Sequence, residues 1–362
     1  MIYKVIGLMS GSSLDGLDVV FTELQEISGK WNYEIGCAAC LDYDEKWIQK
    51  LTHAIGLPSI DYQLLHTEYG RFIGRKINEF IDDNKLHHQV SIISSHGHTT
   101  FHMPEKKMTH QLGDGAAIAA ETRLPVVSDL RSMDIAFGGQ GAPIVPLGEK
   151  LLFSSYNYFL NIGGIANISI NKEDELIAYD VCAANRVLNM LAGEKNLAYD
   201  DGGKISAQGK IHADLLEKLN SLEYYKQPYP KSLANSFGTD IIYPLLKSFS
   251  IHIEDALCTY TEHICTQIKN SLLPFKEDIV QKLFITGGGA FNTFLVERLQ
   301  KNLEEVNFEI FIPGSDVVQY KEALIMALLG VLRWREQYTV LASVTGASRN
   351  SIGGALWLGT EA

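Results

Sequence analysis

The chain has 362 residues, which is longer than a domain with a single hydrophobic core usually is. Its composition, 46% hydrophobic and 20% charged, excludes a wholly disordered protein. Its 31 basic and 43 acidic side chains give a net charge of -12, and we expect no nucleic-acid partner. No apolar run reaches the roughly 18 residues of a membrane span, and the start lacks a signal-peptide pattern, so we expect a cytoplasmic protein. Five cysteines do not make a disulfide framework.

The first half of the chain predicts a β-hairpin and a long helix. Apolar residues 5–9 and alternating residues 17–24 flank a turn rich in serine and glycine, which is typical of a hairpin. Residues 61–82 carry apolar side chains at helical spacing. The other elements that we expect here are a strand at 90–94, a helix at 113–122, a strand at 126–127 and a glycine-rich loop at 136–143.

In the second half, the pattern of strand, glycine turn and strand begins again. Residues 158–162, 168–170 and 176–179 predict three strands, the last of which we expect to end at Asp180. We interpret the repeat as an internal duplication of architecture, with the boundary within residues 143–157. The alternation of strands and helices predicts an α/β chain. The later elements are expected helices near 186–192, 211–222, 240–248, 254–271 and 291–303, a strand at 282–286, and a buried helix at 322–334.

The 31 glycines cluster between apolar runs, which indicates tight backbone turns. The first cluster spans residues 7–18 and combines glycines with serine hydroxyls at a hairpin tip, a composition that can cradle a phosphate. An ordinary hairpin is the alternative, but it needs about two turn residues rather than about seven. The spacing matches neither a Walker A loop, nor a nucleophile elbow, nor a dinucleotide-binding fingerprint.

Two further glycine turns follow strands in the second half. Residues 161–167 turn after an apolar strand, although paired glycines also mark a β-bulge. Residues 285–292 form a strand end, a triple glycine and a helix start, where a nucleotide can lie against backbone at a helix N-terminus. A plain turn between strand and helix needs one glycine rather than three. Together with the first cluster, these turns predict phosphate-facing backbone in both halves.

Titratable residues near these turns are candidates for chemistry. Asp180 ends an apolar strand, where α/β proteins place catalytic groups, but an aspartate there is equally a helix N-cap. Glu322 opens the buried helix, as a candidate acid or as a partner of the helix dipole. His96 and His98 would share a strand face, which fits a metal pair or the polar wall of a pocket. We expect no metal site, because no cysteine or carboxylate nearby in sequence completes one.

As a set, the motifs resemble those of one family, the anhydro-N-acetylmuramic acid kinases of the sugar kinase, actin and Hsp70 superfamily. The resemblance covers nearly the whole chain, and the motifs occur in the family's order. They are GLMSGSSLDG at residues 7–16, SHGHT at 95–99, GGQGAP at 138–143, LNIGGIAN at 160–167 and TGGGAFN at 286–292.

This resemblance implies a fold and an activity. The fold would be a two-domain actin-like ATPase, a duplicated ribonuclease H-like α/β fold with an interdomain cleft. Residues 1–145 would hold substrate-binding elements and residues 146–362 nucleotide-binding elements, with the last helix packed back on the N-terminal half. A homodimer would use ATP and Mg²⁺ to open 1,6-anhydro-N-acetylmuramic acid with water and phosphorylate it to N-acetylmuramic acid 6-phosphate, in peptidoglycan recycling. The alternatives are a kinase for another aminosugar, or a non-catalytic actin-like or Hsp70-like ATP-binding protein.

The resemblance also assigns roles to residues. Asp180 would take the proton of the attacking water, and Glu322 would be a second active-site acid. Arg131 would bind the lactyl carboxylate. The residues expected to bind the sugar are His96, Asp114, Asp129 and Arg131. Those expected to bind ATP are Gly11, Ser12, Ser13, Leu14, Asp15, Gly16, Leu17, Asp18, Gly163, Gly164, Asn167, Gly287, Gly288 and Gly289.

The chain departs from the family pattern in three segments. Residues 180–185 are DVCAAN where the family has DTGPGN, so the acid and the amide are kept while the glycines and proline are lost. Residues 11–13 are GSS where the family has GTS, which keeps the hydroxyl. Residues 231–236 are KSLANS where the family has KSTGRE, which loses a glycine, an arginine and a glutamate.

Overall fold

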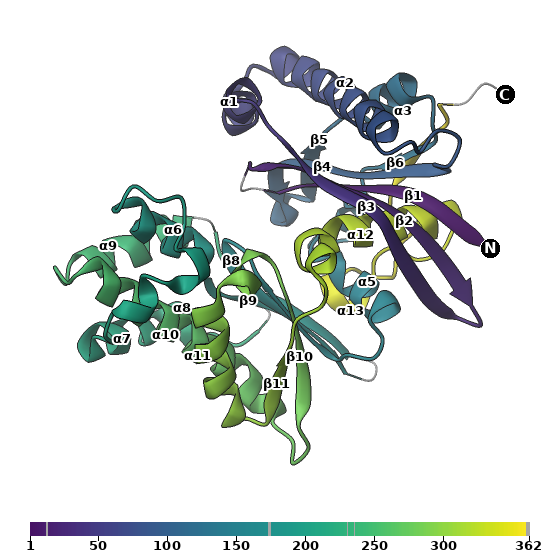
Figure 1. Cartoon of the computed structure of the whole chain (residues 1–362). Helices are drawn as coiled ribbons and strands as arrows, with labels where there is room; N and C mark the ends of the chain where they lie inside the picture. The colour runs from purple at the N-terminus through teal and green to yellow at the C-terminus, as the bar shows by residue number, and fades with distance from the viewer. Residues whose placement is uncertain (12–13, 173–174, 230, 235, 360–362) are drawn as a thin grey trace. The chain divides into compact units, whose positions relative to one another are not determined.

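The computed structural model of the chain describes residues 1–11, 14–172, 175–229, 231–234 and 236–359 (Figure 1). It contains two compact units, each built on a mixed β-sheet with helices, which confirms the expected α/β class. Unit 1 comprises Met1–Ser154 and Tyr320–Ala362, and unit 2 comprises Ser155–Gln319. The functional domains expected at 1–145 and 146–362 stay a prediction. None of the described helices is long and apolar enough to cross a membrane.

The hairpin that the sequence predicts organises the sheet of unit 1. β1 (Ile2–Ser10) and β2 (Gly16–Ile27) pair antiparallel, and β3 (Lys30–Asp42) pairs antiparallel with β2. β4 (Ile92–Met103) runs parallel to β1, and β6 (Val126–Ser128) runs parallel to β4. β1, β4 and β6 therefore end at the same edge of the sheet. The remaining strands are β5 (Met108–Leu112), antiparallel to β4, and β12 (Ala355–Trp357), antiparallel to β6.

The long helix expected at residues 61–82 is α2 (Ser59–Asp83). Its Leu65, Ile73 and Ile77 are buried in one core with side chains of β1 and β2. Leu64 is 62% exposed, because it lies toward the outer side of the helix next to the buried Leu65. The other helices of this unit are α1 (Glu45–His53), α3 (Gly115–Thr122), α4 (Ser132–Ala136), α5 (Val145–Leu152) and α13 (Ala342–Thr345).

The buried helix expected at residues 322–334 is the part of a longer helix that follows a break. α12 runs over Ser315–Trp334, and its backbone leaves helical geometry at Tyr320 (φ -114°, ψ 16°). Only the part after this break is apolar on nearly all sides, so composition indicates that part and misses the polar first turns. Lys321 follows the break and forms a buried ion pair with Glu149 of α5 at 2.5 Å.

The sheet of unit 2 repeats the order of the first. β7 (Tyr158–Ile162), β8 (Ile165–Lys172) and β9 (Glu175–Ala183) form an antiparallel meander. β10 (Gln281–Thr286) runs parallel to β7, and β11 (Phe308–Phe311) runs parallel to β10. The helices of this unit are α6 (Asn185–Gly193), α7 (Ala213–Asn220), α8 (Glu223–Lys226), α9 (Tyr243–Lys247), α10 (Ile253–Leu272) and α11 (Thr293–Glu304).

The two sheets confirm the duplicated ribonuclease H-like architecture. The spatial order β3-β2-β1-β4-β6 in unit 1 corresponds to β9-β8-β7-β10-β11 in unit 2. In both units a hairpin with a glycine turn begins the sheet, and the next strand pairs parallel with the hairpin's first strand. Each unit therefore places one glycine turn beside the end of a parallel strand.

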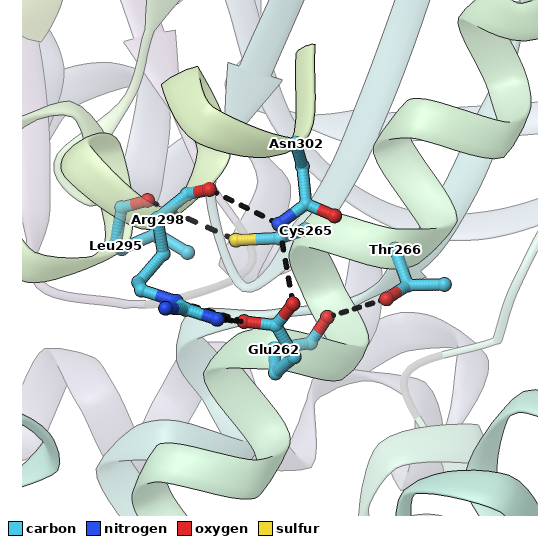
Figure 2. Close-up of polar contacts among 6 residues, drawn as sticks. All are labelled: Glu262, Cys265, Thr266, Leu295, Arg298 and Asn302. Atoms are coloured by element: carbon cyan, nitrogen blue, oxygen red, sulfur yellow. Dashed lines mark hydrogen bonds and ion pairs between the residues drawn. The ribbon is translucent and has the colours of Figure 1, made fainter. Parts of the chain in front are cut away.

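A polar network joins α10 to α11 and so supports the helix that follows the triple glycine (Figure 2). Arg298 donates hydrogen bonds from Nε and Nη2 to Oε2 of Glu262, at 2.9 and 2.5 Å. Asn302 donates from Nδ2 to Oε1 of the same carboxylate at 3.2 Å. The Cys265 thiol donates to the carbonyl of Leu295 at 3.8 Å. Glu262 is 13% exposed at its side chain, so its pair is better shielded than a surface pair.

We expect Glu262→Gln to lower the free energy of unfolding by about 1–2 kcal/mol, because the amide weakens charge-assisted hydrogen bonds from Arg298 and Asn302. Urea unfolding measures the change. The matched control is Glu223→Gln, whose partner is Lys226 in an exposed pair and whose loss should change stability by at most about 0.5 kcal/mol. Equal effects of the two variants would contradict a supporting role for the α10–α11 network.

Candidate active site

The site residues expected in unit 1 follow the ends of its parallel strands. β1 ends at Ser10, which pairs with His98 of β4. β6 ends at Ser128, one residue before Asp129 and three before Arg131. Because the carboxyl ends of parallel strands share one edge, three segments distant in sequence come together there.

The turn between β1 and β2 is shorter than expected, because β2 already starts at Gly16. The Leu14 N–H donates to the carbonyl of Gly11 at 3.4 Å, and Leu14 has a positive φ of 60°. Turns rich in glycine and serine are a type that can bind an anion through backbone N–H groups. Of the other expected nucleotide ligands, Gly16, Leu17 and Asp18 are strand residues, Asp15 is an exposed turn residue, and Ser12 and Ser13 lie outside the described residues.

Asp18 is a strongly perturbed acid beside this turn. Burial, together with the nearby charges of Asp15 and Glu322, raises the pKa of Asp18 to about 6, although a hydrogen bond from the Cys40 thiol opposes the shift. Cys40 is the residue opposite Asp18 in the β2–β3 register. Burial and the Asp18 charge raise the pKa of Cys40 to about 12, so the thiol stays protonated and remains a donor.

Glu322 belongs to the same group of charges. Burial raises the pKa of Glu322, while the positive charges of Lys321 and Arg131 lower it. Glu322 is the second residue after the break of α12 at Tyr320, so both the candidate acid and the first-turn partner of the helix dipole remain open. The expected candidate acid therefore lies within electrostatic range of both Asp18 and Arg131.

His96 and Arg131 contact each other, as the expected sugar-binding residues should. Arg131 donates from Nε to His96 Nε2 at 2.9 Å, and His96 Nδ1 lies 2.9 Å from the carbonyl of Gly97. Both bonds form only when the proton of His96 is on Nδ1. Burial and the Arg131 charge lower the pKa of His96 to about 3, so the ring is neutral. The bond to His96 uses Nε and does not involve the terminal nitrogens of Arg131.

His96 and His98 do not share a strand face, so this expectation is wrong. Gly97 has a φ of 74°. From one matched pair of the register to the next, β4 advances by three residues while β1 advances by two, which makes a β-bulge. A Cβ at Gly97 would lie 2.4 Å from the carbonyl of Leu112, so only glycine fits. The bulge turns His98 toward Ser10. Among the described residues, no group of three or more His, Cys, Asp or Glu side chains could hold a metal ion.

His98 instead ends a buried chain of hydrogen bonds. Its Nδ1 lies 3.0 Å from Ser10 Oγ, which accepts a hydrogen bond from the Tyr43 hydroxyl at 2.8 Å. Tyr43 and Tyr69 hydroxyls are 2.5 Å apart. All four side chains are buried, and burial lowers the pKa of His98 to about 4. This chain ties the last residue of β1 to the core beneath the turn.

Asp114 and Asp129 line a separate feature of unit 1, a cavity of about 190 Å³. Asp114 caps α3 by accepting from Ala116 N–H at 2.9 Å, and Asp129 accepts from the Ser132 hydroxyl at 2.5 Å. His66 and His110 add two rings whose pKa values burial lowers, so they are neutral. Carboxylates and neutral rings suit the hydroxyl and amide groups of a sugar better than its carboxylate. The structure thus gathers the four expected sugar ligands in two pairs.

In unit 2, Asp180 is a strand residue and not a helix N-cap. β9 continues to Ala183 by way of a bulge at Val181, which is why the expected strand end at Asp180 is wrong. The half-buried carboxylate accepts a hydrogen bond from Leu233 N–H at 2.9 Å. Burial raises the pKa of Asp180, and this hydrogen bond opposes the shift. Asn167, an expected nucleotide ligand, is its partner on β8.

The two glycine turns of unit 2 meet. Gly287 has a φ of 83°, and a Cβ there would lie 2.6 Å from Asn161 Oδ1 and 2.8 Å from the carbonyl of Ile162. Asn185 Nδ2 donates to the same carbonyl at 2.9 Å. The expected ligands Gly163, Gly164, Gly287, Gly288 and Gly289 therefore surround the ends of β7 and β10.

Some polar side chains at these edges carry little signal in the sequence. His66 lies within a helix and belongs to no motif, so only its contact with the cavity reveals it. Cys40 ends the CAAC sequence at residues 37–40, but that spacing does not indicate its contact with Asp18. Arg186 follows β9 and Asn185, and its place directly after the segment 180–185 is the signal that could have singled it out.

Comparison with known proteins points to one family. Residues 3–359 match the family model described as anhydro-N-acetylmuramic acid kinase. A protein of that name from Aliivibrio fischeri is 34% identical over 368 residues, which cover 98% of this chain and 99% of that protein. Its namesake from Bacillus thuringiensis subsp. konkukian is 30% identical, with coverages of 96% and 97%. A solved structure, component A of (R)-2-hydroxyglutaryl-CoA dehydratase from Acidaminococcus fermentans, has a TM-score of 0.48 and 15% identity over 91% of this chain and 97% of that one.

We expect Asp18→Asn to stabilise the protein at pH 8 by about 1–2 kcal/mol and to have little effect at pH 4. The native pKa of Asp18 is raised from 3.8 to about 6, so the cost in stability grows as the pH rises from 3.8 toward 6 and is fully present above that value. Urea unfolding at the two pH values measures the difference. Asp278→Asn, an exposed substitution of equal charge, is the control and should show no such pH dependence. A pH-independent effect of Asp18→Asn would refute the assignment.

Proposed function

The chain belongs to the anhydro-N-acetylmuramic acid kinase family, and on that premise we propose which of its residues perform the reaction. It is an ATP-dependent sugar kinase that phosphorylates this anhydro sugar in cell-wall recycling. The observation that carries the assignment of roles is the half-buried Asp180 carboxylate, which accepts a hydrogen bond from the Leu233 N–H beside the glycine turns of unit 2. Burial raises the pKa of Asp180, which makes an oriented carboxylate a better proton acceptor.

In the proposed reaction, Asp180 takes a proton from a water molecule as the water oxygen bonds to the anomeric carbon. The bond from that carbon to the bridging O6 breaks, and O6 attacks the γ-phosphorus of ATP, which releases ADP. The water oxygen becomes the anomeric hydroxyl, its proton leaves through Asp180, and the phosphoryl group ends on O6. A carboxylate suffices as the base because the anomeric carbon gains positive charge as the bridge opens.

Unit 1 supplies groups for the sugar in this proposal. Arg131 binds the lactyl carboxylate through its terminal nitrogens, and the bond from Nε to His96 fixes the plane of the guanidinium. Asp114 and Asp129 accept hydrogen bonds from sugar hydroxyl or amide groups in their cavity. Glu322 is the second acid of the proposed site, where burial raises its pKa and the charges of Lys321 and Arg131 lower it.

The β1–β2 turn and the glycine turns of unit 2 bind the phosphates of ATP in this proposal. The Asp18 carboxylate suits a divalent cation, because it is largely buried and lies near two other acids, Asp15 and Glu322, whose negative charges a cation would offset. Mg²⁺ in nucleotide sites typically uses one or two carboxylates and the phosphates themselves, so no larger protein cage is needed. When bound, Mg²⁺ supplies neutralisation of phosphate charge.

We also propose a cytoplasmic homodimer. A cytoplasmic location fits the use of ATP as phosphoryl donor. Support for self-association comes from exposed apolar side chains close together in the sequence of unit 1, where Ile55, Ile60 and Leu64 are each more than 60% exposed.

The proposed reaction is tested by incubating the protein with ATP, Mg²⁺ and 1,6-anhydro-N-acetylmuramic acid in water enriched in ¹⁸O. Mass spectrometry should find N-acetylmuramic acid 6-phosphate with one ¹⁸O, placed at the anomeric hydroxyl. ADP without this product would sink the proposed function, and a phosphorylated product without ¹⁸O would sink the water attack.

We expect Asp180→Asn to lower kcat by at least about 10³-fold while ATP binding stays within about twofold, because an amide cannot accept the proton. In the wild type, activity should fall as the pH drops through the Asp180 pKa, which burial raises above that of an ordinary aspartate. The pH profile of kcat and nucleotide titration measure both effects. The control is Asp278→Asn, an exposed site. Retained turnover in Asp180→Asn would remove Asp180 from its role.

A further inference from the structure

We propose that Arg186, the second residue of α6, binds a phosphate group beside the turn of Gly163 and Gly164. This inference rests on the proposed function, because it assumes that the ligand is ATP or a phosphorylated sugar. Its carrying observation is that Arg186 Nε is buried and has no hydrogen-bond partner among the described residues. A buried donor left unpaired lowers stability, so native structures keep one chiefly where a ligand or a water molecule completes it.

The Arg186 side chain is packed against two glycines. A Cβ added at Gly164 would lie 3.8 Å from both the Cβ and the Nε of Arg186, and one added at Gly238, in a π-helical turn (Phe237–Ile242), would lie 3.9 Å from its Cδ. The aliphatic part of the Arg186 side chain therefore lies next to both glycines. Neither glycine has a side chain that could pair with the guanidinium.

In the part of the chain that the structure describes, Arg186 forms no ion pair with an acidic side chain. The chain holds 43 acidic and 31 basic residues, so an arginine that pairs with none of these acids is informative. Elsewhere in unit 2, Arg298 pairs with Glu262 through both Nε and Nη2. A guanidinium kept apart from carboxylates remains available to an anionic ligand.

Backbone donors at this turn are largely used within the protein. The N–H groups of Ala184 and Asn185 donate to the carbonyls of Gly164 and Gly163, at 2.8 and 3.0 Å. The N–H of Gly163 donates to the carbonyl of Ile165 at 3.3 Å. The start of α6 is therefore closed by carbonyl oxygens, and a phosphate at this turn needs a side-chain donor.

The planar fork of Arg186 matches phosphate oxygens, which it can bind with Nε and one terminal nitrogen together. Two sources offer that group in this enzyme, the nucleotide and the 6-phosphate of the product. Both present the same chemistry to the guanidinium, so binding measurements must separate them.

The test compares Arg186→Met with the wild type by titration calorimetry, without turnover. Ligands are ATP, ADP, adenosine, N-acetylmuramic acid 6-phosphate and N-acetylmuramic acid. If Arg186 binds the nucleotide, we expect about 10- to 100-fold weaker binding of ATP and ADP and no change for adenosine. If it binds the product, we expect the same loss for N-acetylmuramic acid 6-phosphate and no change for N-acetylmuramic acid. Arg75→Met removes the same charge from an exposed site on α2 and should leave all affinities within about twofold.

Unchanged affinities in Arg186→Met, or an equal loss for adenosine and ATP, would overturn the proposal. Thermal unfolding without ligand adds a second readout, because Arg186→Met removes the unpaired buried donor and should match or exceed wild-type stability. A purely structural arginine would lower it. Arg186→Lys keeps the charge without the fork and should restore part of the phosphate affinity. Because the test measures binding alone, it stands even if the protein fails to phosphorylate the anhydro sugar.

Discussion

Parallel pairing of β1 with β4, and of β7 with β10, is the constraint on which the candidate site depends. It sets Ser10 opposite His98 in unit 1 and Asn161 opposite Thr286 in unit 2. Since the partner strands are reached through crossover connections, the turn that follows the first strand and the loop that follows the second lie at one edge. The glycine turns owe their position to this register, and so does Asp180, which lies on β9 beside the second turn.

Local patterns predict much of this architecture. Alternating apolar residues and a glycine-serine turn indicate the hairpin of β1 and β2, and the same signals indicate β7 and β8. The helical spacing at residues 61–82 predicts α2 within two residues at each end. These features depend on interactions between near neighbours in the chain, which is why spacing and composition suffice. The duplication is visible for the same reason, since it repeats local patterns.

Features that depend on distant partners escape such patterns. The bulge at Gly97 exists because Leu112 lies against that glycine, and it separates His96 from His98. β9 continues past Asp180 because β8 still pairs with it. In the same way, Asp114 and Asp129 join His66 and His110 around a cavity that four separate segments build. The family resemblance predicts sugar-binding roles for Asp114 and Asp129, whereas the grouping of the four residues follows from tertiary packing.

The hydrogen bond between Cys40 and Asp18 bears on how the enzyme tolerates oxidants. Thiols are oxidised as thiolates, and burial beside an acid raises the pKa of Cys40 to about 12, which leaves almost no thiolate at neutral pH. A sulfur atom can therefore lie next to the proposed phosphate turn without making ATP binding sensitive to peroxide. Loss of the Asp18 charge would remove one cause of the raised Cys40 pKa, so one carboxylate of the proposed nucleotide site also helps to keep the neighbouring thiol protonated.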